Sequence, residues 1–191
     1  MNKKRLMIAS GLIIIVAVCA VVFYRLTYPV NLHMGTLDWV TSEYLRHGDG
    51  PTRNVKFLGA GLVIDEKGYY LISVDEDFGY VCLEEGPLGR HRIRNVGYGG
   101  GVFRKGIVES NGKKYLLFAG LDSIGVIDKI TVQIQDSTYE LSIGNHRPFL
   151  DYTEIDASTT EEYVDLDKIT LYDASGNDIT ANYDLSGGTF K

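Results

Sequence analysis

The 191-residue chain has few cysteines and few prolines, and no recognisable catalytic motif. Of its two cysteines, Cys19 falls in an apolar segment, so Cys82 has no disulfide partner in the rest of the chain. The fold must therefore be stabilised by its core. His-Glu-x-x-His, Cys-x-x-Cys, Gly-x-Ser-x-Gly and phosphate-loop patterns are all missing. We predict no catalytic residue, no metal site and no cofactor.

Charge is missing from one long stretch, the nineteen residues 6–24. A helix of that length covers about 28 Å, close to the hydrocarbon thickness of a bilayer. This predicts an uncleaved transmembrane anchor. A cleaved signal peptide or a lipoprotein acylated at Cys19 are the two alternatives. The run is longer than the roughly 7–15 apolar residues of a signal peptide, and Val18 is bulkier than a lipoprotein site prefers.

The charges on either side of this segment predict its orientation. Three basic residues precede it and only Arg25 follows it closely, so the positive-inside rule places the N-terminus in the cytoplasm. We expect a cell-membrane protein that crosses once. Its parts are a cytoplasmic tail (1–5), an anchor (6–24), a spacer with a short helix (25–54) and an extracytoplasmic β domain (55–191).

Positive charge is scarce beyond the anchor. Four of the 19 basic residues and none of the 25 acidic residues precede Pro29, so the remainder has a formal charge of −10. This balance excludes nucleic acid as a partner and argues against non-specific adhesion to anionic polymers. The expected partners are the membrane, through residues 6–24, and a protein or an anionic component of the cell envelope.

A short helix is predicted over residues 36–47, with Gly48 at its C-terminal end. Leu37, Val40 and Tyr44 would form one apolar stripe. This pattern indicates a helix packed on a sheet. A helix that lies on the membrane or binds a partner is the alternative.

From Val55 onward, β-rich runs alternate with turn signals at intervals of about eight to twelve residues, without helical segments between them. Asn111-Gly112 is the strongest hairpin signal and calls for a type I′ turn. The pattern predicts a mainly β fold, an antiparallel β-sandwich or partly closed barrel.

Arg90, Arg92 and Arg94 alternate along one predicted strand, so their side chains should project from one face. Such a row of guanidinium groups on an acidic domain is a candidate binding site for a carboxylate, a phosphate or an acidic partner. The alternative is internal pairing with Glu84 on the preceding strand.

Residues 68–74, 92–99 and 114–120 resemble segments of membrane-anchored proteins of Gram-positive, spore-forming bacteria that have no assigned role. The resemblance implies an outer-surface protein and transfers no catalytic or binding residue. We therefore expect a non-catalytic, membrane-anchored binding or interaction module for an unknown ligand. An envelope hydrolase or transferase that uses dispersed acidic residues, or a structural wall spacer, are the alternatives.

Overall fold

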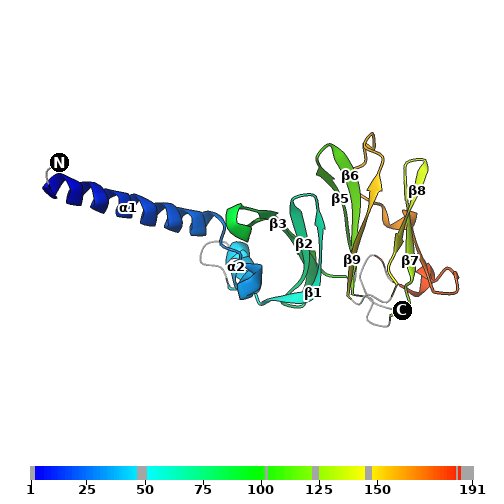
Figure 1. Ribbon diagram of the computed structural model, residues 1–191. Coiled ribbons are helices and arrows are strands. Elements are labelled where there is room, and N and C mark those ends of the chain that lie inside the picture. Colours follow the sequence, from blue (N-terminus) through cyan, green and yellow to red (C-terminus); the bar gives the residue numbers. More distant parts are fainter. Residues whose placement is uncertain are drawn as a thin grey trace.

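The computed structural model describes residues 3–46, 51–101, 103–121, 125–144, 148–183 and 185. Its first element, α1 (Lys3–Thr27), projects from the rest of the molecule as a single helix (Figure 1). In the described part of the chain, one helical segment is long and apolar enough to cross a membrane, Ser10–Thr27, and none of it is buried. By length and composition it fits a membrane anchor or a signal sequence.

The predicted short helix is present as α2 (Leu37–Leu45), after a 3₁₀ turn, η1 (Leu32–Met34). Its inward side carries the buried residues Leu37, Val40, Thr41 and Ser42. Tyr44 is exposed, so the expected apolar stripe does not extend to the last turn of the helix. Gly48 lies outside the described residues.

Ten strands are described. The strands are β1 (Val55–Ile64), β2 (Lys67–Val74), β3 (Asp77–Glu85), β4 (His91–Gly99), β5 (Phe103–Ser110), β6 (Lys113–Gly120), β7 (Lys129–Ile134), β8 (Ser137–Ser142), β9 (Phe149–Ile155) and β10 (Ile169–Tyr172). The further 3₁₀ turns are η2 (Pro87–Gly89), η3 (Leu166–Lys168) and η4 (Thr180–Asn182).

The strands form three antiparallel sheets with the orders β1-β2-β3-β4, β5-β6-β9 and β10-β7-β8. The sheets follow one another away from α1, and α2 covers the sheet nearest to it (Figure 1). The predicted mainly β class and its sandwich form are therefore confirmed. No barrel closes among the described strands.

The core lies between these layers, and β6 shows why they stack. Its residues from Tyr115 to Gly120 are all buried, because one side of the strand faces the first sheet and the other faces the third. Leu117 packs towards the first sheet, whereas Leu116 and Phe118 pack towards the third. Each such buried side chain contributes roughly 1.5–3 kcal/mol.

Two-residue turns set the register of four hairpins. Asn111 and Gly112 have φ values of 49° and 76°, which confirms the predicted turn between β5 and β6. Asp65, Asp75 and Gln135 open three further two-residue turns at φ values of 53°, 55° and 52°. The left-handed conformation matches the twist of the strands that these turns connect.

Candidate functional site

Two members of the predicted arginine row converge on one carboxylate. Glu84 on β3 lies opposite Arg92 on β4 and accepts a hydrogen bond of 2.5 Å from its Nη2 atom. Arg94 forms an ion pair with the other oxygen of Glu84, at a point where β4 bulges. The hydrogen bond from Arg92 lowers the pKa of the Glu84 carboxyl. The alternative of internal pairing is therefore observed for these two arginines, and a binding role for them stays a prediction.

Arg90, the third member, lies just before β4 and has different partners. Its Nε and Nη2 atoms donate hydrogen bonds of 2.7 and 2.6 Å to the backbone carbonyls of Tyr28 and Pro29. Arg92 also reaches this segment, since its guanidinium carbon lies 5.7 Å from the centre of the Tyr28 ring. Two of the three arginines therefore contact the segment that leaves α1, Arg90 through its backbone and Arg92 through the Tyr28 ring. The sequence pattern carried no signal for this contact, because Tyr28 and Arg90 are 62 residues apart.

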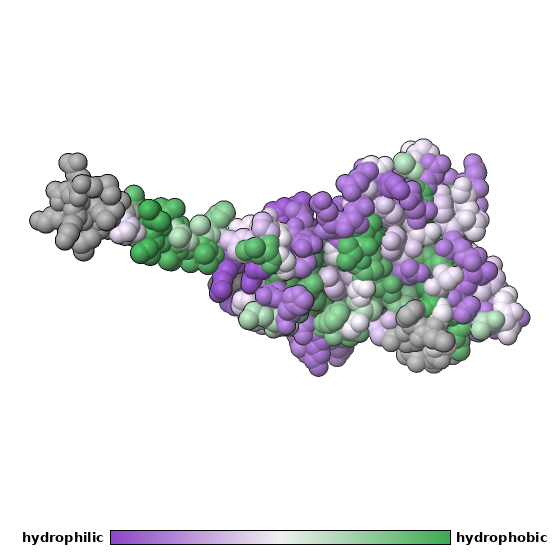
Figure 2. Space-filling view, in the orientation of Figure 1, coloured by the Kyte–Doolittle hydropathy of each residue, from purple (hydrophilic) through white to green (hydrophobic). Residues whose placement is uncertain are grey.

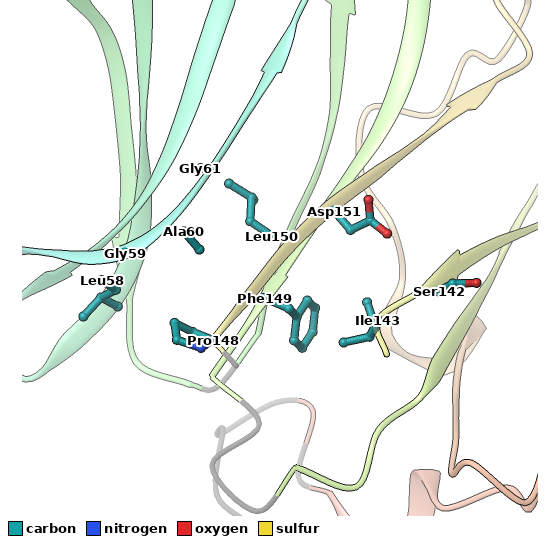
Figure 3. A pocket seen from close by; sticks show the side chains of 10 residues that line it. All are labelled: Leu58, Gly59, Ala60, Gly61, Ser142, Ile143, Pro148, Phe149, Leu150 and Asp151. Atoms are coloured by element: carbon teal, nitrogen blue, oxygen red, sulfur yellow. The ribbon is translucent and has the colours of Figure 1, made fainter. Parts of the chain in front are cut away.

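A groove between the first two sheets is a second candidate site. It has a volume of about 510 Å³ and lies between β1 and β9 (Figure 3). Its lining consists of Leu58, Gly59, Ala60, Gly61, Ser142, Ile143, Pro148, Phe149, Leu150 and Asp151. Leu58, Ala60 and Leu150 pack against the apolar cluster beneath it. The groove thus combines an apolar floor with walls that are largely backbone.

An irregular stretch of β1 forms one wall of the groove. Phe57 pairs with Ile72 and Gly61 pairs with Tyr70, so three residues of β1 oppose a single residue of β2. Gly59, in the middle of the bulge, has a φ of +82°, and nothing lies within 4 Å of the position that a Cβ atom would take there. Another polypeptide backbone can therefore approach β1 closely at this position.

Both strands along the groove are edge strands. β1 ends the first sheet and β9 ends the second, and neither has a strand partner on its outer side among the described residues. Side chains cover single amides on these strands. Asp38 accepts a hydrogen bond from the Phe57 amide at 2.9 Å, and Asp151 accepts one from the Tyr152 amide at 2.8 Å. Apart from such single amides, an edge strand without a partner strand is able to accept another strand.

Several other titratable groups have a pKa displaced by contacts within the fold or by burial. Among the described residues, each carboxyl group with a displaced pKa has a pKa lowered mainly by hydrogen bonds. These groups are Asp75, Glu84, Asp156, Asp173 and Asp178. Burial raises the pKa of the Cys82 thiol, which is packed between two sheets as a small apolar group. Among the described residues, no group of three or more His, Cys, Asp or Glu side chains is arranged to hold a metal ion.

Comparison with known proteins adds no relative. No protein family matches this chain, and neither a curated protein nor a solved structure matches it. The resemblance to membrane-anchored proteins of spore-forming bacteria therefore stays a prediction, and any functional reading depends on the geometry described above.

The arginine row was visible in the sequence, whereas the groove was not. Its one local signal is the sequence Leu58-Gly59-Ala60-Gly61 inside an otherwise β-rich run, since glycine within a strand often marks a bulge or a close backbone approach. The second wall comes from β9, about ninety residues later, and no local pattern relates the two.

Proposed function

We propose that this chain is a membrane-anchored, extracytoplasmic binding module, and that the groove between β1 and β9 takes an extended polypeptide segment. The observation that carries the proposal is the pair of open strand edges facing one groove. A strand added to an edge gains main-chain hydrogen bonds, and its alternate side chains are read by pockets.

The shape and chemistry of the groove support an extended segment. Its volume of about 510 Å³ lies within the range of ligand sites, about 300–1,000 Å³. Gly59 presents no side chain that would hold a backbone away from β1, and nothing lies within 4 Å of its Cβ position. Leu58, Ala60 and Leu150 offer apolar contact to those side chains of the bound segment that point towards the floor of the groove.

The anchoring rests on α1 and its flanking charges. Ser10–Thr27 is apolar and unburied, and basic residues are concentrated on its N-terminal side. The positive-inside rule then leaves the β domain (β1–β10) outside the cytoplasm. The resemblance to membrane-anchored proteins of Gram-positive bacteria agrees with this placement and adds no ligand.

The described carboxyl groups with a displaced pKa are engaged by hydrogen bonds within the fold. A general acid needs a carboxyl with a raised pKa in a cleft. The carboxyls with displaced pKa values here are all displaced downward, by hydrogen bonds made within the fold. Carboxyl groups with lowered pKa values stay ionised at neutral pH, where they stabilise the fold and carry negative charge.

Site-specific photo-crosslinking in living cells tests the proposal. Ser142 is exposed and lines the groove, whereas Ser137 is exposed at the opposite end of the same strand, β8. A benzoylphenylalanine at position 142 should give a discrete adduct with an intact polypeptide, and the same residue at position 137 should not.

Other outcomes select the alternative functions. Recovery of a cleaved or glycosyl-modified product at position 142 would favour the envelope hydrolase or transferase. An absence of any adduct at position 142, with the chain present at wild-type level, would contradict a groove ligand and favour a structural spacer.

A further inference from the structure

The end of the β domain beside α1 exposes three large apolar or aromatic side chains. Trp39 and Tyr44 on α2 are 64% and 47% exposed, and Leu88 in η2 is 91% exposed. The opposite side of α2 already buries Leu37 and Val40 against the first sheet. α2 therefore has a second, outward apolar side that no described part of the chain covers.

The groove that Trp39 and Tyr44 share with the end of α1 shows where this outward side lies along α1. Trp39 and Tyr44 line an apolar groove of about 450 Å³ together with Leu26 and Thr27, the last residues of the apolar span. Eighteen helical residues cover about 27 Å, nearly the hydrocarbon thickness of a bilayer. The groove thus lies where the hydrocarbon ends and the headgroups begin, the level at which Trp and Tyr rings are most favourable.

The turn that carries Leu88 lies at a similar depth beside the helix. The Tyr24 hydroxyl donates a hydrogen bond to the Pro87 carbonyl, and Tyr24 belongs to the same apolar span. Leu88 has a φ of +59°, a conformation that costs a leucine free energy, and its side chain is almost fully exposed. Insertion into a bilayer would give that side chain a favourable environment.

The junction between α1 and the β domain holds these groups in place. Arg90 binds the carbonyls of Tyr28 and Pro29, and Val30 forms a β-bridge with His91. The Tyr28 ring lies so close to Gly86 that a Cβ atom there would be 2.2 Å from the ring. The positions of α2 and η2 relative to α1 are therefore fixed, so the depth of α1 in a membrane also sets their depth.

We propose that this end of the β domain rests on the bilayer that α1 crosses, with Trp39 and Tyr44 in the headgroup layer and Leu88 at the acyl boundary. The inference rests on the proposed anchoring of α1 and is separate from the groove ligand. Figure 2 shows hydrophobic surface along α1 and in patches on the adjoining end of the molecule, among mostly hydrophilic surface. Because the domain is acidic, the contact is one of aromatic and apolar groups with neutral phospholipid.

The test uses the single tryptophan of the chain, Trp39, as a probe. The full chain is reconstituted into phosphatidylcholine vesicles, with and without lipid brominated near the headgroup end of its acyl chains. Trp39 should lose most of its fluorescence in the brominated vesicles and be shielded from a water-soluble quencher. The matched control is the double variant Trp39→Phe, Tyr163→Trp. Tyr163 is 77% exposed and precedes β10 of the sheet farthest from α1, so its fluorescence should be unchanged.

Vesicle flotation separates the two ways in which the test can fail. Chain that floats with the vesicles while Trp39 stays unquenched would keep the anchor and overturn the surface contact. Chain that does not float would overturn the anchoring itself, and the contact with it. Quenching of both tryptophan positions would also overturn the proposal, because it would mean that the whole domain lies flat on the membrane.

A second variant, Leu88→Asn, tests the turn. Asparagine tolerates the left-handed conformation, so the thermal stability of the full chain in detergent should be unchanged or raised. In brominated vesicles the quenching of Trp39 should fall. Unchanged quenching would remove Leu88 from the contact.

Discussion

Val30 and His91 exchange backbone hydrogen bonds of 3.0 and 2.9 Å and form an isolated antiparallel bridge. The bridge joins the segment that leaves α1 to the first residue of β4. Because Arg90 binds the two carbonyls just before Val30, the backbone is held at three consecutive residues. The orientation of the β domain relative to α1 is thus determined by specific contacts.

Loss of Arg90 should loosen this junction. Arg90→Ala removes two charge-assisted hydrogen bonds, worth roughly 1.5–3 kcal/mol each when one partner is charged. We expect the amides of Val30 and His91 to exchange hydrogen at least about tenfold faster, since 1.4 kcal/mol corresponds to a factor of ten. Hydrogen exchange with mass spectrometry on the full chain in nanodiscs measures this. Arg46→Ala, which removes an exposed pair with Glu43, is the control and should leave these amides unaffected.

The two arginines that share Glu84 should differ in importance. Arg92 contacts both Glu84 and the Tyr28 ring, whereas Arg94, 52% exposed, contacts Glu84. Arg92→Ala should therefore lower the melting temperature of the full chain more than Arg94→Ala does. If Arg92→Ala instead left the melting temperature unchanged and weakened capture of an anionic partner, the row would be a binding face after all.

Acidification should weaken the structure around His91. Burial lowers the pKa of this imidazole from its ordinary value of 6.5. Glu85 opposes this by raising the pKa, and the nearby His33 lowers it further. Its Nδ1 atom is buried without a hydrogen-bond partner. Because the folded chain binds fewer protons here than the unfolded chain, the stability is fully present above about pH 6.5 and is lost as the pH falls towards the folded pKa.

Thermal unfolding between about pH 7.5 and pH 5.5 measures this effect. His91→Phe should remove most of the pH dependence in that window. The carboxyls with lowered pKa values respond only below their ordinary values of 4.5 for Glu84 and 3.8 for Asp75, so they do not contribute to it. A wild-type profile that stays flat across the window would contradict the assignment.

Backbone conformation at the hairpin between β5 and β6 gives a matched pair of variants. Gly112 has a φ of +76° and nothing within 4 Å of its Cβ position, so Gly112→Ala should cost roughly 1–2 kcal/mol through backbone strain alone. Gly97 in β4 has no such strain, and its nearest atom would be 3.9 Å away. Gly97→Ala should therefore change the free energy of unfolding by less than about 0.5 kcal/mol. Equal effects of the two changes on denaturant unfolding would rule out the strain argument.

Much of the local structure could be predicted from the sequence. β-rich runs separated by turns follow one another from Val55 as predicted, and Asn111-Gly112 forms the expected turn. The two-residue turns at Asp65, Asp75 and Gln135 have weaker sequence signals, because Asp-Glu and Gln-Asp pairs favour positive φ less than Asn-Gly does. The arginine row is visible in the sequence, and two of its members pair with Glu84, as the alternative interpretation expects.

The sequence by itself determined the apolar helix, the charge balance, the strand segments and most turns, because these depend on side-chain periodicity and turn chemistry within a few residues. Only the tertiary structure decided which strand edges remain open, that β1 and β9 enclose a groove, and that Arg90 holds Tyr28. Those relationships join segments about 60 to 90 residues apart. They arise when whole sheets bury their apolar faces against one another, and the free energy of that packing is shared among many side chains.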